Sequence, residues 1–157
     1  QNWNAAKQAG LKTGAYHYFT LCREGKEQAG NFIRTVPADP QILPYAIDLE
    51  FTGNCTSRPD KRIFTKNLDA FIKEVSGVYR MRPVLYTTYD FYLSYLKETK
   101  FETYSYWVRD VFGRIDENVF PGWVIWQYAD NGRVGGINGN VDLNVMYVKT
   151  QTGKGNR

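Results

Sequence analysis

Histidine, cysteine and long apolar runs are all scarce in this sequence of 157 residues. It contains one His and two Cys. No apolar run approaches the roughly 20 residues that a membrane-spanning helix needs, so we expect no membrane insertion. The opening stretch, QNWNAAKQAG, has neither the basic region nor the apolar segment of a signal peptide. If the protein is exported, its signal lies outside this chain.

The patterns that usually hold metals are missing as well. Cys22 and Cys55 lack the spacing of a zinc site or a redox pair. Each follows an expected strand by a few residues, and either a disulfide or two free thiols would fit that position. The Gly/Asn-rich segment 130–140 is not an EF-hand loop, because its twelfth position, where such loops carry Glu, is Val141. We expect no metal and no cofactor.

Charge of one sign is not clustered anywhere. The 20 basic residues are scattered among 16 acidic ones, and without a Lys/Arg run or an RNA-binding signature we expect no nucleic-acid partner. The net charge of +4 and pI near 9 would suit an anionic partner such as a bacterial wall polymer. Aromatic residues, by contrast, are abundant, with 12 Tyr, 9 Phe and 4 Trp. Such side chains fill cores and also stack on ring-shaped ligands.

Helical and strand-like segments alternate along the chain, which reads as one domain over residues 1–157. Strand-like runs begin at Gly14, Tyr45, Pro83, Ser105, Trp123 and Val141, and helical patterns cover 2–9, 24–36, 61–79 and 90–97. This order predicts an α/β fold with a mostly parallel sheet, either open or closed into a barrel. The glycines of 130–140 predict a hairpin between the last two strands.

Two carboxylates stand in one strand-like run, PYAIDLEFTG, residues 44–53. Side chains alternate along a strand, so Asp48 and Glu50 point to the same face, about 6 to 7 Å apart along the backbone. Burial favours the protonated form, and two neighbouring acids push their pKa values apart. One acid can then stay charged while the other keeps a proton near neutral pH. Acid catalysis of glycosidic bond cleavage uses this arrangement.

Salt bridges or helix capping would explain an Asp-x-Glu pattern about as well. The position favours chemistry, because ligands of α/β folds gather at the carboxyl ends of strands, where Asp48 and Glu50 lie. Asp142 is a third acid in an apolar strand, VDLN, near the end of the chain. In a barrel it could face the same cavity as the first two.

The segments AYHYF, YAIDLE, VLYTTYDFY, YWV and WVIWQYADNGRVGGINGNVDLN, in this order, resemble the family 25 glycoside hydrolases, the Chalaropsis-type lysozymes or N-acetylmuramidases. The likeness spans nearly the whole chain. It implies a TIM-like (β/α)5(β)3 barrel and peptidoglycan glycan strands as the partner, cleaved at the β-1,4 bond between N-acetylmuramic acid and N-acetylglucosamine. It also implies action outside the cell or in the cell wall, after export or delivery by a phage.

The resemblance implies roles for single residues. Glu50 would be the general acid and Asp48 its partner carboxylate, which orients a 2-acetamido group that acts as the nucleophile. Asp142 matches the family's late acidic residue at the rim of the cleft. Tyr16 and Tyr18 fit the family's aromatic lining of the sugar site. Further candidates for that wall, each of which could equally be plain core, are Tyr86, Trp107 and Trp126. The single histidine, His17, has the opposite strand parity from Tyr16 and Tyr18, and we expect it to be structural.

The chain departs from the family in two ways. Two strands that precede QNWNAAKQAG in relatives have no counterpart, so we expect a partial barrel of about six strands. Its open edges would favour association with another copy or strand exchange. Arg109 stands where relatives prefer a small residue, and a guanidinium in the cavity would lower carboxyl pKa values. A sugar-binding remnant without activity, or an interaction domain with structural acids, are therefore the alternatives to a muramidase.

Overall fold

The computed structural model describes residues 2–38 and 43–147, which form six strands and the helices between them. The elements, in chain order, are α1 (Asn2–Gln8), β1 (Tyr16–Tyr18), α2 (Gly25–Thr35), β2 (Ala46–Leu49), α3 (Lys61–Tyr79), β3 (Val84–Thr87), α4 (Tyr89–Phe91), the π-helix η1 (Tyr92–Leu96), the 3-10 helix η2 (Lys100–Thr103), β4 (Ser105–Arg109), β5 (Trp123–Gly132) and β6 (Val141–Met146).

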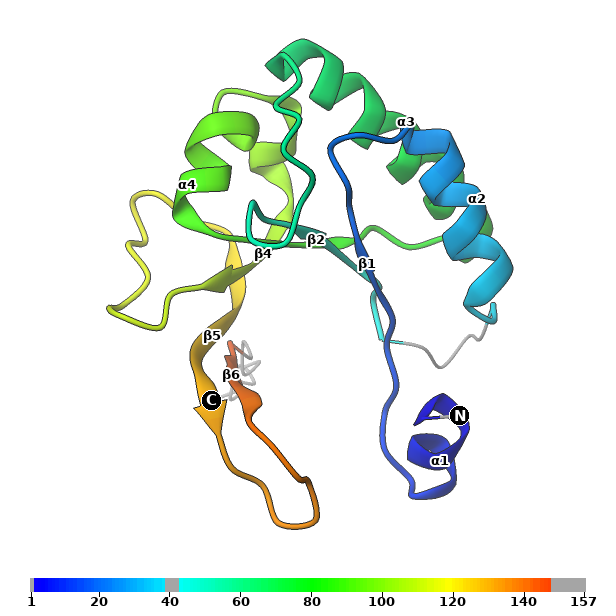
Figure 1. Ribbon diagram of the computed structural model, residues 1–157, viewed down its shortest axis with the longest axis vertical. Helices are drawn as coiled ribbons and strands as arrows, with labels where there is room; N and C mark the ends of the chain where they lie inside the picture. Colours follow the sequence, from blue (N-terminus) through cyan, green and yellow to red (C-terminus); the bar gives the residue numbers. More distant parts are fainter. Residues whose placement is uncertain (1, 39–42, 148–157) are drawn as a thin grey trace, which may run out of the picture.

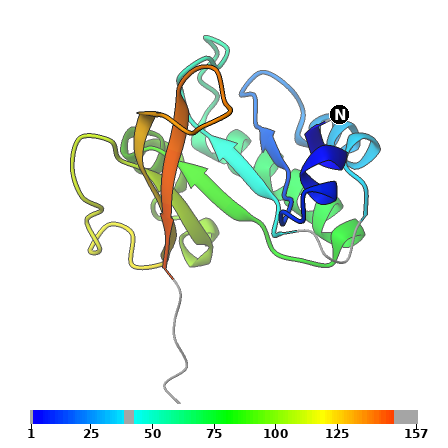
Figure 2. The same ribbon diagram turned by 90° about the horizontal axis from the view of Figure 1, so that it is seen from below.

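The strands form one curved sheet in the order β1-β2-β3-β4-β5-β6. Strands β1 to β5 are parallel to their neighbours, and β6 pairs with β5 antiparallel. Figure 1 shows α2, α3 and α4 over the outer face of the sheet, and Figure 2 shows the strands from the uncovered side. The predicted mostly parallel sheet of six strands is confirmed, and it has the shape of a half-barrel.

The longest helix, α3, begins and ends where its sequence dictates. The carboxylate of Asp60 accepts a hydrogen bond of 2.7 Å from the backbone N–H of Arg62, which caps the first turn. At the other end Arg80 adopts a left-handed conformation, with φ of 53°, and stops the helix. The apolar positions of the expected helix are buried except Ile63, which is 49% exposed. The buried ones are Phe64, Leu68, Phe71, Ile72, Val75 and Tyr79.

Helix α2 packs closely against α3 because its first residue is glycine. A Cβ atom on Gly25 would lie 1.8 Å from the backbone oxygen of Asn67 in α3. The Asn67 side chain also accepts a hydrogen bond from the Gly25 N–H. His17 lies beneath these helices, stacked on Phe71 at 4.8 Å and hydrogen-bonded to Gln28 at 3.1 Å. Burial lowers the pKa of His17, in keeping with the expected structural role.

Two segments differ from the predicted elements in detail. The helix expected over 90–97 is a single turn, α4, continued by the π-helix η1. Strand β5 runs on into the Gly/Asn-rich segment as far as Gly132, so the predicted hairpin is shorter than the segment 130–140. Among the described residues, no helix is long and apolar enough to cross a membrane.

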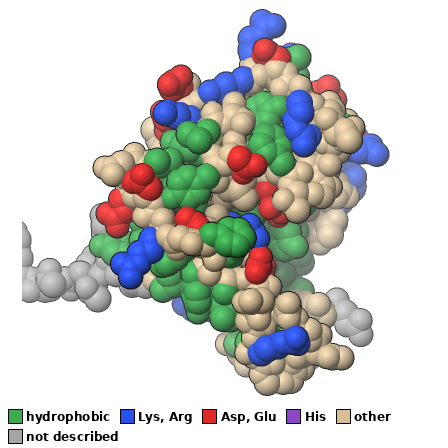
Figure 3. All heavy atoms as spheres, turned by 60° about the vertical axis from the view of Figure 1, so that its left-hand side comes forward, with side chains coloured by type: hydrophobic (Ala, Val, Ile, Leu, Met, Phe, Trp, Pro, Cys, Tyr) green, Lys and Arg blue, Asp and Glu red, His purple; other side chains and the backbone are tan. Residues whose placement is uncertain are grey.

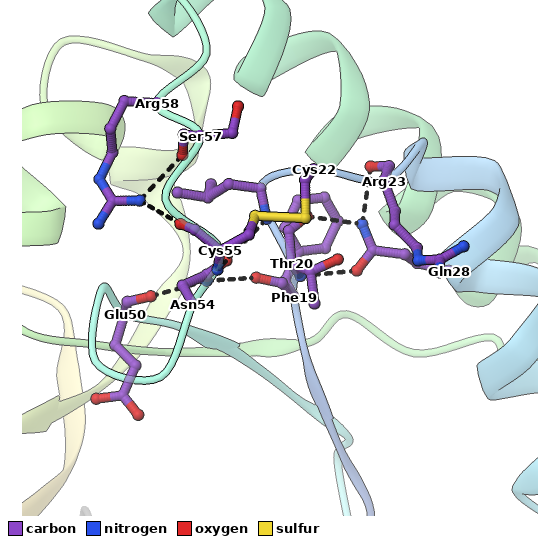
Figure 4. Close-up of a disulfide and its surroundings, with 11 residues drawn as sticks. Phe19, Thr20, Cys22, Arg23, Gln28, Glu50, Asn54, Cys55, Ser57 and Arg58 are labelled. Atoms are coloured by element: carbon purple, nitrogen blue, oxygen red, sulfur yellow. Dashed lines mark hydrogen bonds between the residues drawn. A yellow bond between two sulfur atoms is a disulfide. The ribbon is translucent and has the colours of Figure 1, made fainter.

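Cys22 and Cys55 form a disulfide, which the sequence left open. It joins the loop after β1 to the loop after β2 at the carboxyl ends of these strands (Figure 4). Asn54 reinforces the connection, since its side chain donates to the carbonyls of Phe19 and Glu50 and accepts from the N–H of Leu21. The disulfide and Asn54 thus fix the loop that follows Glu50 to the neighbouring strand.

Removal of this disulfide is expected to destabilise the fold. Cys22 and Cys55 are 33 residues apart, and closing a loop of that length restricts the unfolded chain by roughly 3 to 4 kcal/mol. The double variant Cys22→Ser/Cys55→Ser should lose about 2 to 4 kcal/mol in free energy of unfolding in urea. Dithiothreitol should lower the Tm of the parent protein and leave that of the double variant unchanged. A parent Tm that does not respond to dithiothreitol would contradict the structural role of the bond.

Candidate active site

A pocket of about 280 Å³ lies on the concave face of the sheet, opposite the helices. Its lining comes from all six strands and from the residue that follows β2: Tyr16, Ala46, Asp48, Glu50, Tyr86, Trp107, Gln127 and Asp142. A second hollow beside α1 is lined by Lys7, Gly10, Leu11, Lys12 and Thr13 and contains no carboxyl or aromatic group. The concave pocket is therefore the one that combines acids with aromatic walls.

Strand register brings the side chains of this pocket to one level. Asp48 of β2 is paired with Tyr86 of β3, and Tyr86 with Trp107 of β4. All three point to the concave face, while their neighbours Ile47 and Leu49 are fully buried beneath the helices. The alternation predicted for the Asp-x-Glu strand is what separates the acids from the core.

Asp48 is a carboxylic acid without a counter-charge. Its Oδ1 atom is enclosed and has no hydrogen-bond partner among the described residues. Burial, and after it the charge of Glu50, raises the pKa of Asp48 from 3.8 to about 7. A carboxyl group in this setting keeps its proton up to neutral pH.

Glu50 follows β2 directly and is half-buried. Burial raises its pKa; Arg109 opposes that shift, whereas Asp90 and Asp142 reinforce it. Its backbone carbonyl is held by Asn54, and its carboxyl group points away from the disulfide loop (Figure 4). Within the described part of the chain, neither Asp48 nor Glu50 forms an ion pair, so the salt-bridge explanation of the pattern has no support in the structure.

Asp142 reaches the same pocket from β6, at the far end of the sheet from β1. Its side chain is exposed, and its charge contributes to the raised pKa of Glu50. The structure thus brings together the three acids that the sequence singled out. Each comes from a strand end or edge, where solvent and ligands have access.

Three of the five predicted aromatic residues line the pocket: Tyr16, Tyr86 and Trp107. The rings of Tyr86 and Trp107 meet edge to face at 5.5 Å, and the indole N–H of Trp107 donates to Asn144 at 2.8 Å. Tyr16 is 69% exposed at the edge of the sheet. Tyr18 is set back from the lining, since its hydroxyl donates to the carbonyl of Thr52 at 2.7 Å.

Trp126 lies on the other face of the sheet. It is paired with Val108, whose side chain belongs to the buried core, whereas its neighbour Gln127 lines the pocket. The indole N–H of Trp126 donates to the carbonyl of Asp110 at 2.8 Å. Its expected place in the sugar-binding wall is therefore corrected: strand alternation assigns the pocket to Gln127 and turns Trp126 away.

Gln127 was missed in the sequence, although the signal that identified Asp48 was present. It is a polar residue within the apolar strand WVIWQYA, and it is only 3% exposed.

Among the described residues, no group of three or more His, Cys, Asp or Glu is arranged to hold a metal ion. The site is built from carboxyl, amide and aromatic groups.

Arg109 lies on β4 two residues beyond Trp107 and forms an ion pair with Asp130 of β5, Nη2 to Oδ2, at 2.6 Å. It is not among the residues that line the pocket. Its charge nevertheless lowers the pKa of Glu50. The sequence-based concern that Arg109 would act on the acids is supported for Glu50.

Known proteins resemble this chain in sequence and fold. It is 33% identical over 146 residues to the Escherichia coli O157:H7 protein named "Uncharacterized protein YegX", covering 93% of this chain and 52% of that protein. It is 30% identical over 142 residues to the autolytic lysozyme of Clostridium acetobutylicum, covering 90% and 41%. The chain thus spans about half the length of these curated relatives, or less.

A solved structure of a family 25 glycosyl hydrolase from Bacillus anthracis superposes with a TM-score of 0.84 and 34% identity, over 94% of this chain and 69% of that one. The family model described as glycosyl hydrolases family 25 matches residues 1–137. That match extends from α1 through β5 and includes both acids of the β2 segment. The chain therefore belongs to glycosyl hydrolase family 25.

Proposed function

We propose that this chain is the catalytic part of a muramidase that cleaves the β-1,4 bond between N-acetylmuramic acid and N-acetylglucosamine in peptidoglycan. The observation that carries the proposal is the pair Asp48 and Glu50: two carboxyl groups with raised pKa values and no ion pair, in a pocket with aromatic walls. A cell-wall substrate places the action of the protein in the wall or outside the cell. The autolytic lysozyme named among the relatives supports this direction.

In the proposed reaction, Glu50 transfers its proton to the glycosidic oxygen as the bond from that oxygen to the sugar C1 breaks. The carbonyl oxygen of the substrate's own 2-acetamido group forms the new bond to C1. Asp48, as the carboxylate, accepts the acetamide N–H and stabilises the positive charge that develops there. Water then attacks C1 as the bond from C1 to the acetamido oxygen breaks, and it gives a proton to the Glu50 carboxylate, which restores the starting state of the protein.

These roles require that Asp48 and Glu50 together hold one proton, and that this proton is on Glu50. In the free protein Asp48 is the more enclosed acid and holds the proton more strongly. A bound sugar changes both environments, because it displaces water from the half-buried Glu50 and offers an N–H donor to the unpartnered oxygen of Asp48. The first effect raises the pKa of Glu50 and the second lowers that of Asp48. Substrate binding thus moves the shared proton to the acid that uses it.

The aromatic residues of the pocket are proposed to hold the sugar rings. Tyr86 and Trp107 form the floor beside Asp48, with Trp107 fixed by its bond to Asn144. Tyr16 provides a wall at the β1 edge, with Tyr18 behind it. Asp142 stands at the opposite rim, and its charge favours the protonated form of Glu50. The amide of Gln127 adds a donor and an acceptor for sugar hydroxyl groups.

We also infer that the half-barrel is part of a (β/α)5(β)3 barrel whose open edges pair with further strands. Ala15 and Phe19 bond to β2 through their main chains, so the main-chain groups of Tyr16 and Tyr18 face the free edge of β1. At the other edge, Val145 and Met146 of β6 are 44% and 58% exposed. Figure 3 turns the side of the β5–β6 hairpin forward, and hydrophobic side chains are exposed on it.

A non-catalytic sugar-binding protein is the second candidate, and the open edges favour it. A half-barrel surrounds a substrate less completely than a closed barrel does. This would weaken binding of the transition state more than binding of the unreacted sugar. The two candidates differ in whether the proton of Glu50 is needed.

Glu50→Gln is expected to abolish the clearing of purified bacterial cell walls. The amide keeps the shape of the side chain but donates no proton to the leaving oxygen, so the rate should fall by about two to four orders of magnitude. Glu74→Gln, at an exposed position of α3, is the matched control and should clear walls like the parent. If the parent protein binds walls without clearing them, the sugar-binding function is correct. Equal clearing by parent and Glu50→Gln would refute the role of Glu50.

Asp48→Asn is expected to stabilise the fold in a pH-dependent way. The folded pKa of Asp48, about 7, lies above its ordinary value of 3.8. Its contribution to stability is therefore fully present below the ordinary value and is lost as the pH rises through 7. Asn resembles the protonated acid at every pH, so the Tm advantage of the variant should be smallest in acid and grow up to neutral pH. A Tm difference that is constant with pH would contradict burial of the charge.

Open strand edges should make the isolated chain self-associate. Sedimentation velocity at tens of micromolar should show species larger than the monomer, in proportions that rise with concentration. Val145→Lys should shift the distribution toward monomer, because a charge on an edge strand opposes pairing. A single monomer boundary for the parent protein at these concentrations would contradict pairing with another copy.

A further inference from the structure

The ion pair of Arg109 with Asp130 lies near the proposed general acid, Glu50. In strand order, β3 alone separates β2 from β4. Leu49 is paired with Thr87, and Thr87 with Val108, so the next residues, Glu50 and Arg109, stand at the same level. Two strand spacings amount to about 10 Å. Extended glutamate and arginine side chains can together span that distance.

Asp130 reaches Arg109 through an irregularity in β5. Gln127, which lines the pocket, is opposite Asn144, while Ala129 is opposite Leu143. One step along β6 therefore corresponds to two along β5, which is the signature of a bulge. Beyond it, alternation is reversed: Ala129 takes the outer face and Asp130 the face of the pocket. Without this extra residue, Asp130 would point away from Arg109.

We propose, on the basis of the proposed function, that Asp130 is a positioning residue: it binds the guanidinium of Arg109 on the β5 side and keeps it from forming an ion pair with the Glu50 carboxyl. The 2.6 Å contact is charge-assisted, and Arg109 is the more buried partner, 30% exposed against 46% for Asp130. The guanidinium thus has a fixed orientation. Glu50 stays free of an ion pair and available to donate its proton.

Other charged and titratable groups around Glu50 do not replace this function. The acids Asp90 and Asp142 disfavour its charged form, and the charge of Glu50 in turn raises the pKa of Asp48. The phenols of Tyr18 and Tyr86 have raised pKa values, so they are neutral in the working range. Arg58, in the loop after Glu50, donates to the carbonyls of Cys55 and Ser57 and lies on the far side of the loop from the Glu50 carboxyl (Figure 4). Arg109 is therefore the cation that matters.

Asp130→Asn keeps the shape of the side chain and removes its charge. The released Arg109 is then expected to turn toward Glu50, and an adjacent guanidinium lowers a carboxyl pKa by about one to three units. The pKa of Glu50 can be read directly by NMR titration of protein labelled with ¹³C at the glutamate carboxyl, with Glu50→Gln to assign the signal. This readout needs no substrate, so it tests Asp130 even if the parent protein clears no walls.

The expected pattern involves three variants and a control. The pKa of Glu50 should fall by about one unit or more in Asp130→Asn and rise in Arg109→Gln. The double variant should match Arg109→Gln, because Asp130 acts only through Arg109. Glu27→Gln removes the acid of an exposed ion pair between Arg23, which precedes α2, and Glu27 in its first turn, and should leave the pKa of Glu50 unchanged.

The pH dependence of wall clearing should shift in the same direction as the pKa of Glu50 in each variant. Clearing requires protonated Glu50 and declines as pH rises through its pKa, so the alkaline limb should move to lower pH in Asp130→Asn and to higher pH in Arg109→Gln. At a pH above the Glu50 pKa of both the parent and the variant, each unit of pKa difference corresponds to about a tenfold change in rate. An unchanged Glu50 pKa in Asp130→Asn, or an equal fall in the double variant, would overturn the proposal. Failure of the parent to clear walls would instead count against the muramidase function alone.

Discussion

An enclosed carboxyl oxygen without a partner, Oδ1 of Asp48, is the feature on which the site depends. A buried acid that cannot form an ion pair or a hydrogen bond stays protonated to higher pH, and a second acid two residues away makes the charge of each dependent on the other. The strand that carries the two acids cannot rotate to expose them fully to water, because its opposite face presents Ile47 and Leu49 to a closely packed core. One face of β2 thus packs in the core, while the other carries the acids of the pocket.

The surrounding structure serves to hold that strand end in place. Asn54 clamps the backbone of Glu50 to β1, and the disulfide from Cys22 to Cys55 closes the same loop from above. On the other side, the bulge in β5 turns Asp130 toward Arg109, and the ion pair between them holds the guanidinium that lowers the pKa of Glu50. These contacts lie outside the pocket, yet each restricts where the Glu50 carboxyl and its neighbouring charges can go. Placement of the proposed proton donor therefore depends on residues outside the pocket.

Local periodicity was enough to predict the sheet, the long helix α3 and the acids of β2, because strand alternation and helical spacing are properties of neighbouring residues. It was not enough wherever register between strands decides the outcome. Trp107 and Trp126 look alike in sequence, but the register shift between β4 and β5 is needed to see that one faces the pocket and the other does not. Asp130 is hidden for the same reason. The pairing of Cys22 with Cys55 likewise depends on two loops that meet only when β1 and β2 lie side by side.

A sugar-binding protein and a hydrolase make different demands on position 48. For binding alone, an asparagine would offer a hydrogen-bond acceptor and a donor without the cost of enclosing an ionisable group. An aspartate there is useful when the site must gain charge as the substrate does, which is what a developing cationic centre requires. The same reasoning applies to Arg109: a guanidinium close to a proton donor is harmful to an acid catalyst unless it is held by another carboxylate, and Asp130 holds it. A protein that only binds sugars needs neither the unneutralised pair nor the restrained cation. The presence of an unneutralised acid pair in the pocket and of a restrained cation near it is the physical argument that favours catalysis over binding.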